Sequence, residues 1–209
     1  MSEAKTEILS RIRAALGQER HAPEVPREYL RTSGLAQHEL VELFVERASD
    51  YRAAVYQTTA ANIAQTVAEI CHSRRAARLV IPDDMPEAWL SDGVDFVRDA
   101  ALSYGELEAL DGVLSGCALA VAQTGTIVLD GGKAQGRRVL TLLPDLHLCV
   151  IFEAQIVGTV PEAVSRLQGA ETRPLTFISG PSATSDIELS RVEGVHGPRI
   201  LDIILVGET

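Results

Sequence analysis

The fold is decided by the stretch CALAVAQTGTIVL at residues 117–129, where two apolar runs flank four small or polar residues. Both runs are short and rich in Ala, Val, Leu and Ile, which is typical of buried β-strands. The connection between them is too short to hold a crossover helix, so the two strands must be antiparallel neighbours. The stretch therefore predicts an antiparallel insert in the surrounding structure.

Helical and strand-like patterns alternate on both sides of this stretch. The expected helices are 38–50, Thr58 or Thr59 to Cys71, a short one at Trp89, 104–110, 161–168 and 186–191. The expected strands are 53–56, 78–81, 94–97, 139–143, 148–152, 175–178 and 200–206. Such alternation predicts βαβ crossovers. We therefore expect an α/β fold: a mixed sheet with parallel βαβ units and an antiparallel insert.

An amphipathic helix is predicted at the N-terminus. Ile8, Leu9, Ile12 and Leu16 recur at helical spacing, and Gly17 ends the pattern. Residues 18–35 are polar and contain two prolines. We therefore expect an N-terminal helix and linker over residues 1–35 and an α/β domain over residues 36–209. The apolar helix face packs either on its own domain or on a partner.

The composition limits the classes of partner. The chain has 209 residues and a net charge of −10, which disfavours binding to nucleic acid or anionic membranes. No apolar run approaches the roughly 18 residues of a membrane span. The first residues include Glu3 and Glu7 and lack the apolar segment of a signal peptide. We therefore expect a cytoplasmic protein with no membrane span and no nucleic-acid partner.

The three cysteines, Cys71, Cys117 and Cys149, are widely spaced. An iron–sulfur cluster needs about four thiolates, so the chain cannot hold one alone, and no His, Cys or carboxylate spacing predicts a metal site. Three cysteines also make a poor disulfide framework, which fits a reducing cytosol. Cys117 and Cys149 lie in apolar runs and are interpreted as buried, inert thiols.

A turn rich in small residues follows the expected strand 175–178. Gly180 and Pro181 end the strand, and Ser185 with Glu188 fits a capping box that opens a helix. Free backbone N–H groups at such a turn bind anions. The predicted anion-binding residues here are Gly180, Ser182, Thr184 and Asp186. The alternative is an ordinary strand–helix turn, in which an acid of the first helical turn stabilises the helix dipole.

Further candidates lie elsewhere in the chain. The segment Thr124-Gly125-Thr126 is either a hairpin turn or a second anion cradle. Arg138 borders an apolar segment and either binds a carboxylate through its guanidinium or pairs with a surface acid. His196 stands among glycines on a tight loop and is the candidate for proton transfer. His147 lies in an apolar run and is interpreted as a core residue.

Several short motifs together resemble the LUD domain family over roughly residues 113–206. They are Gln123-Thr124-Gly125-Thr126, Arg138 and His147 on either side of Pro144, Gly180-Pro181-Ser182 through Asp186-Ile187-Glu188, and His196-Gly197-Pro198. The segment Arg11–Leu16 is also typical of the family. One departure is Gln123, where family members often carry glutamate; an amide cannot act as an acid or base.

The resemblance implies a fold like that of ribose-5-phosphate isomerase, glucosamine-6-phosphate deaminase and the CoA transferases. It also implies a role in oxidising L-lactate to pyruvate alongside two iron–sulfur proteins. No dinucleotide or flavin motif is evident, so electrons are expected to pass to clusters in these partners, with no cofactor in this chain.

Three functions remain open. The first is a component of a cytosolic lactate-oxidising system that binds a small carboxylate. The second is a stand-alone enzyme, either sugar-phosphate isomerase-like or CoA-transferase-like. The third is a non-catalytic structural or regulatory subunit that docks through the helix at residues 4–16.

Overall fold

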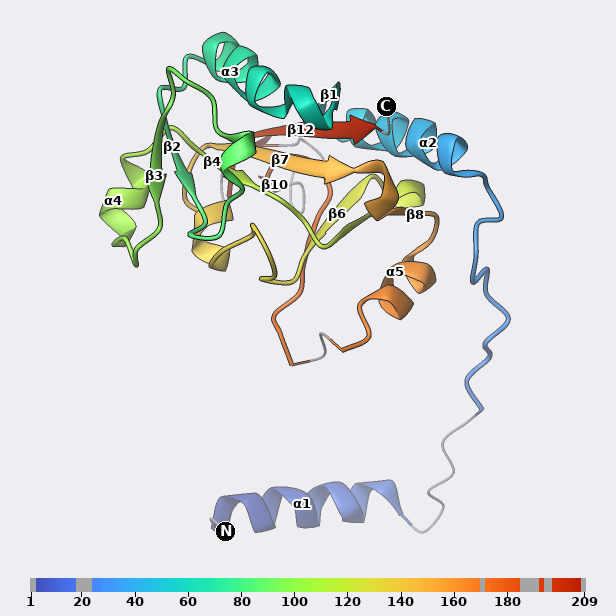
Figure 1. Ribbon diagram of the computed structural model, residues 1–209. Coiled ribbons are helices and arrows are strands. Elements are labelled where there is room, and N and C mark those ends of the chain that lie inside the picture. The colour runs from blue at the N-terminus through green and yellow to red at the C-terminus, as the bar shows by residue number, and fades with distance from the viewer. Residues whose placement is uncertain (1–2, 18–23, 170–171, 185–191, 194–196, 208–209) are drawn as a thin grey trace.

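The computed structural model describes residues 3–17, 24–169, 172–184, 192–193 and 197–207 (Figure 1). The α-helices are α1 Glu3–Leu16, α2 Gln37–Asp50, α3 Ile63–Arg74, α4 Tyr104–Glu108 and α5 Val160–Arg166. The strands are β1 Ala54–Thr59, β2 Arg78–Ile81, β3 Asp95–Arg98, β4 Gly112–Ser115, β5 Leu119–Val121, β6 Thr126–Leu129, β7 Leu146–Phe152, β8 Ile156–Val157, β9 Thr176–Ile178, β10 Ala183–Thr184, β11 Val192–Glu193 and β12 Ile200–Gly207.

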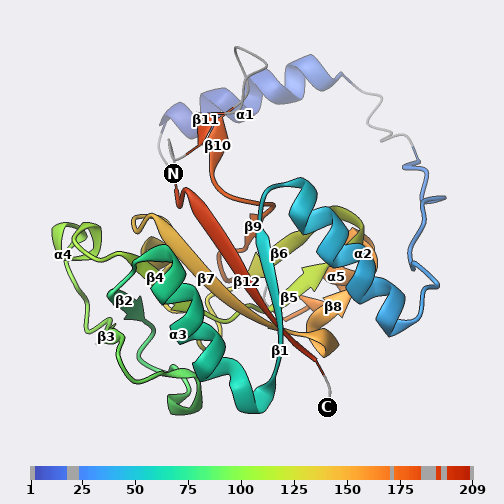
Figure 2. The ribbon, with the colours of Figure 1, turned by 90° about the horizontal axis from the view of Figure 1, so that it is seen from above.

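The main sheet has six parallel strands in the order β1-β12-β7-β4-β2-β3. Its central strands β7 and β12 are almost wholly buried because apolar layers cover both faces. One face packs against α3, and the other against α2 and a smaller sheet. Seen from above, β1 and β12 run between α3 and α2 (Figure 2).

The smaller sheet contains the predicted insert and has the order β8-β5-β6-β9. Strands β5 and β6 are antiparallel, with Leu119 opposite Val128, and β6 is antiparallel to β9. Strand β8 adds to β5 in parallel. A mixed α/β fold with parallel βαβ units and an antiparallel insert is therefore confirmed.

The expected strand 139–143 is wrong. Residues Arg138–Thr141 form a 3₁₀ turn, η4. Leu140 is fully buried against α4 and β4, and Leu143 joins the same cluster three residues later. A helical turn places two residues at this spacing on one face, whereas a strand would place them on opposite faces. Packing of Leu140, and in part of Leu143, into one cluster therefore fits a turn better than a strand.

Two other predictions at the level of elements differ from the structure, and one cannot be compared with it. Strand β4, Gly112–Ser115, was not expected. The helix that contains Cys71 begins at Ile63, after a 3₁₀ turn at Ala60–Asn62, so Thr58 and Thr59 do not cap it. The helix expected at 186–191 lies outside the described residues, while the flanking strands β10 and β11 pair antiparallel.

A buried ion pair ties α3 to the centre of the main sheet. Asp202 on β12 is fully buried and accepts two hydrogen bonds from the Arg74 guanidinium, at 2.8 and 2.7 Å. These bonds raise the pKa of Arg74. A buried carboxylate needs such a partner, because an unpaired charge in the sheet would cost several kcal/mol.

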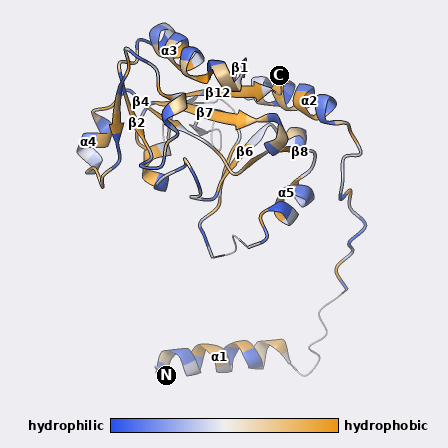
Figure 3. Ribbon diagram, viewed as in Figure 1, coloured by the Kyte–Doolittle hydropathy of each residue, from blue (hydrophilic) through white to orange (hydrophobic). Residues whose placement is uncertain are grey.

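Helix α1 lies apart from the α/β body (Figure 1), and residues 24–36, which precede α2, form no helix or strand. It has no buried residue, and Ile8 is 58% exposed. It carries both hydrophobic and hydrophilic residues (Figure 3). Of the two placements expected for this helix, the structure does not show packing on its own domain. No helix in the described parts of the chain is long and apolar enough to cross a membrane.

Candidate functional site

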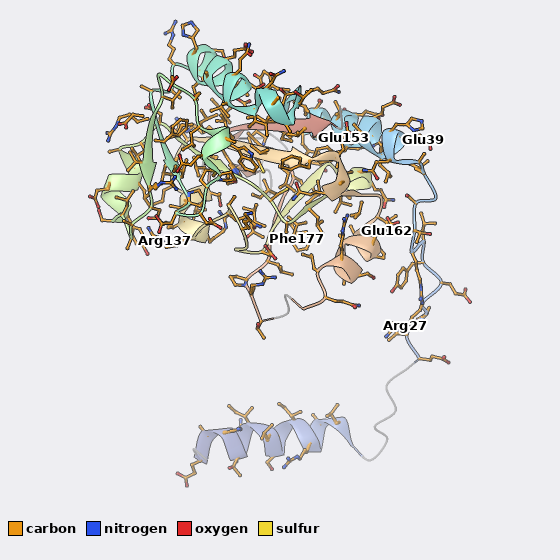
Figure 4. All side chains as sticks on the ribbon, in the orientation of Figure 1. Arg27, Glu39, Arg137, Glu153, Glu162 and Phe177 are labelled. Atoms are coloured by element: carbon orange, nitrogen blue, oxygen red, sulfur yellow. The ribbon has the colours of Figure 1, made fainter. Side chains whose placement is uncertain are left out.

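A cavity of about 280 Å³ opens between the main sheet and the smaller sheet. Its walls come from η4, from the first residues of β7 and β12, from β9 and from the turn that follows β9. Phe177 on β9 is one wall residue and is labelled in Figure 4. The polar side chains that line it are Arg138, Thr141, His147, Thr176, Ser179 and Ser182. We call this space the Arg138 cavity.

Arg138 supplies positive charge to this cavity. One guanidinium nitrogen, Nη1, donates a hydrogen bond of 2.8 Å to Thr141 Oγ1, and no described carboxylate pairs with it. Burial lowers the pKa of Arg138, but a guanidinium stays protonated at neutral pH. Its neighbour Arg137 instead binds Asp99 with two hydrogen bonds of 2.6 Å. Arg138 therefore retains donors for an anion in the cavity.

The turn after β9 also lines the cavity, through Ser179, Gly180 and Ser182. Gly180 has φ of +80°, and a side chain there would lie 2.4 Å from the carbonyl oxygen of Tyr51. The Ser182 N–H donates to Pro198 O at 2.9 Å, so it is not free for a ligand. The turn continues into strand β10. The hydroxyls of Ser179 and Ser182 also line the cavity and can meet a ligand there.

The segment Thr124–Thr126 stands behind the cavity wall. Thr126 Oγ1 lies 2.7 Å from Thr124 Oγ1 and 2.8 Å from Ser179 Oγ, which forms part of the wall. Gly125 has φ of +58°, and a side chain there would lie 2.6 Å from the backbone of Arg47 and Ala48. Close packing against α2 therefore explains the glycine, and the two threonines support Ser179.

His147 is a cavity residue that the sequence pattern alone assigned to the core. It is 1% exposed, yet it lines the cavity, and its Nε2 lies 2.8 Å from Ser115 Oγ. The sequence does not indicate the contact between His147 and Ser115, because Ser115 ends β4, a strand that the sequence pattern does not predict. Only the pairing of β4 with β7 brings the serine and the histidine together.

Three of the predicted site residues cannot be placed at the cavity. His196 and Asp186 lie outside the described residues, and only the backbone of Thr184, in β10, is described. Gly197 and Pro198, which follow His196, do line the Arg138 cavity. Within the described ranges, no group of three or more His, Cys, Asp or Glu side chains is arranged to hold a metal ion.

Comparisons with known proteins agree with this architecture. The model of the LUD domain matches residues 41–206. The chain is 46% identical to lactate utilization protein C of Deinococcus radiodurans, covering 99% of this chain and 97% of that protein. It is 27% identical to lactate utilization protein C of Macrococcus caseolyticus, covering 84% and 81%.

A solved structure is also similar to this chain in fold and sequence. The crystal structure of a DUF162 family protein from Deinococcus radiodurans superposes with a TM-score of 0.73 at 43% sequence identity. It covers 83% of this chain and 99% of the solved chain. The chain belongs to the LUD domain family.

Proposed function

We propose that the protein binds a small carboxylate in the Arg138 cavity, as a component of a cytosolic system that oxidises L-lactate to pyruvate. The names of the relatives, lactate utilization protein C, support the pathway. The observation that carries the binding proposal is Arg138, a guanidinium that lines a cavity without a described carboxylate partner. A carboxylate is the anion that a guanidinium binds with two parallel hydrogen bonds.

The remaining wall groups suit a 2-hydroxy or 2-oxo acid. The hydroxyls of Thr141, Ser179 and Ser182 donate or accept, and His147 adds a ring on the main-sheet side. With the carboxylate on Arg138, the 2-oxygen can meet these groups. A volume of about 280 Å³ is small for a ligand site and suits a metabolite of lactate size better than a CoA thioester.

The chemistry of lactate oxidation separates two roles, substrate binding and electron acceptance. Oxidation of lactate releases two electrons, which need an acceptor. We assign binding and orientation of the carboxylate to this chain, and electron acceptance to iron–sulfur partner proteins. In a dye-reduction assay with co-expressed candidate iron–sulfur proteins, omission of this chain should abolish lactate-dependent reduction. Full activity without it would refute the assignment.

Ligand screening tests the binding proposal. A ligand that binds only the folded protein raises the melting temperature, and the rise grows with the logarithm of ligand concentration relative to Kd. L-lactate and pyruvate should stabilise the protein, whereas ribose 5-phosphate and CoA should not. Stabilisation by the sugar phosphate alone would instead support an isomerase-like enzyme.

A docking role for α1 is a second candidate, because Ile8, Ile12 and Leu16 are all exposed. An amphipathic helix gains free energy when its apolar face is covered. Deletion of residues 1–17 should then abolish co-purification with the iron–sulfur proteins while carboxylate binding persists. Co-purification at the level of the full chain would exclude this role.

A further inference from the structure

His147 and Ser115 lie on the face of the main sheet that is turned toward the smaller sheet. His147 and Cys149 are two residues apart on β7 and so share one face, and Ser115 on β4 is paired with Cys149. Cys149 packs in the cluster between the two sheets. Leu201, which is paired with His147 on β12, lines the Arg138 cavity together with it. The imidazole therefore stands at the cavity wall with Ser115 beside it.

The Ser115 hydroxyl has two polar neighbours but only one proton to donate. Its Oγ lies 3.0 Å from the carbonyl oxygen of Gly116 and 2.8 Å from His147 Nε2. A carbonyl oxygen only accepts hydrogen bonds, whereas a ring nitrogen of neutral imidazole donates in one tautomer and accepts in the other. All three residues are buried, so hydrogen bonds among them decide which tautomer is stable.

Both contacts are hydrogen bonds only when the ring proton of His147 is on Nε2. In that tautomer Nε2 donates to Ser115 Oγ, and the hydroxyl donates to Gly116 O. With the ring proton on Nδ1, the hydroxyl would have to donate to Nε2 instead, and its hydrogen bond to Gly116 O would be lost. A buried hydrogen bond that is left unmade costs free energy. The arrangement around Ser115 therefore favours the Nε2–H tautomer.

The other ring nitrogen, Nδ1, is then a hydrogen-bond acceptor, because it carries a lone pair and no proton. The structure gives it no hydrogen bond to a described residue, yet it is not among the buried side-chain atoms that lack a partner. It therefore borders open space, and the open space that His147 lines is the Arg138 cavity. The main sheet thus presents a fixed acceptor to a ligand in this cavity.

We propose that His147 makes the Arg138 cavity selective for 2-hydroxy acids over 2-oxo acids, an inference that rests on the proposed carboxylate binding and refines its ligand class. With the carboxylate on Arg138, a 2-hydroxyl donates a hydrogen bond to Nδ1 of His147. A 2-oxo group has no proton to donate, so its oxygen and Nδ1 would meet as two acceptors. The buried acceptor is then left unpaired, which weakens binding of the 2-oxo acid.

Arg138 alone does not distinguish lactate from pyruvate, because both acids carry the same carboxylate. The two differ at the 2-oxygen, which is a donor and acceptor in lactate and only an acceptor in pyruvate. His147 reads this difference, and Ser115 acts on it indirectly as a positioning residue that fixes the tautomer. The protein would thus hold lactate more tightly than the oxidised product.

The tautomer is measured by a long-range ¹H–¹⁵N correlation spectrum of the full chain without ligand, in the buffer used for binding. The protonated and unprotonated nitrogens of a neutral imidazole resonate far apart, and the ring is assigned through the backbone of His147. We expect the proton on Nε2. A proton on Nδ1, or on both nitrogens, would overturn the proposal whether or not an acid binds.

Titration calorimetry with L-lactate and with pyruvate tests the selectivity. Wild type should bind lactate about 10-fold more tightly, since pyruvate leaves the Nδ1 acceptor unpaired. His147→Gln retains an amide that can donate to Ser115 but lacks the ring acceptor, so the preference should fall to about 2-fold or less. The control is His72→Gln, the same substitution at an exposed position of α3, which should keep the wild-type preference.

The outcomes separate this proposal from the proposed function. Equal affinity of wild type for the two acids, or tighter binding of pyruvate, would overturn the selectivity and leave the carboxylate site standing. No binding of either acid would overturn the proposed function and the selectivity with it. Ser115→Ala frees the ring to adopt either tautomer and should lose most of the preference while both acids still bind; an unchanged preference would contradict the role of Ser115. The spectrum and the wild-type titrations decide the question even if the variants fail to fold.

Discussion

His147 Nε2 lies 2.8 Å from Ser115 Oγ, across the pairing of β7 with β4. The histidine is buried in the main sheet on one side and lines the Arg138 cavity on the other. Its orientation at the cavity therefore depends on a serine that is itself fully buried. The main sheet positions the imidazole by a hydrogen bond and not by packing alone.

Replacement of Ser115 with alanine should destabilise the protein. The change leaves a buried imidazole nitrogen without its partner, which costs about 1–3 kcal/mol of unfolding free energy. Urea unfolding measures the loss. The Ser73→Ala variant is the control, because Ser73 only bonds Ile70 O within its own helix; we expect a loss below about 0.5 kcal/mol there. Equal losses of unfolding free energy in both variants would show that the Ser115–His147 hydrogen bond stabilises the protein no more than the Ser73 bond does.

Gly125 should be far less tolerant of alanine than Gly131. Both have positive φ, at +58° and +65°, which costs an alanine about 1–2 kcal/mol. Only at Gly125 does the added Cβ meet backbone, at 2.6 Å from Arg47 and Ala48, whereas nothing lies within 4 Å at Gly131. Overpacking should add about 1–3 kcal/mol at Gly125. Chemical denaturation of the two variants measures the difference. Equal stability would mean that α2 shifts without cost to make room for the added methyl group.

The Arg137–Asp99 pair predicts a pH-dependent contribution to stability. Hydrogen bonds from Arg137 are the main cause that lowers the pKa of Asp99, whose side chain is 5% exposed. A lowered folded-state pKa stabilises the protein above the unfolded pKa, about 3.9, and this contribution is lost as the pH falls through the folded value. Arg137→Gln should therefore cost roughly 0.5–1 kcal/mol at neutral pH.

The difference between wild type and Arg137→Gln should shrink as unfolding is measured at pH values below about 4. Arg13→Gln, on the exposed face of α1, is the control and should change stability at no pH. A loss for Arg137→Gln that stays constant down to acid pH would exclude Asp99 as its source.

Removal of residues 1–17 should leave the unfolding free energy of the rest of the chain unchanged. Helix α1 has no buried residue, so its deletion exposes no core. The later part of the linker differs, because Arg31 O accepts a hydrogen bond of 3.0 Å from Thr159 Oγ1. Thermal unfolding of the shortened chain measures this; a lower melting temperature would show that α1 packs on the body in solution.

Much of the fold could be predicted from the sequence, because apolar periodicity reports local structure directly. The hairpin of β5 and β6 followed from a connection too short for a helix, and β2 was placed at its observed bounds. Strand β4 was missed since Gly112–Ser115 has only two apolar residues. The sequence predicts a strand where Arg138–Thr141 form a 3₁₀ turn, because a short apolar run fits a strand or a helical turn equally well.

The candidate site was less predictable, because it depends on pairing between distant segments. Arg138 and the turn at Gly180–Ser182 line one cavity, although they are distant in the sequence. The roles of Gly125 and His147 depend on α2 and β4, which approach them only in the folded chain. No local pattern contains that information.

The central claim is that Arg138 binds a carboxylate, and titration calorimetry with L-lactate tests it most directly. Arg138→Gln removes the charge and should weaken binding about 10- to 100-fold, as expected for charge-assisted hydrogen bonds of about 1.5–3 kcal/mol. Arg137→Gln, the adjacent arginine already paired with Asp99, should bind lactate as wild type does. Unchanged affinity in a folded Arg138→Gln variant, or equal weakening in both variants, would contradict the account.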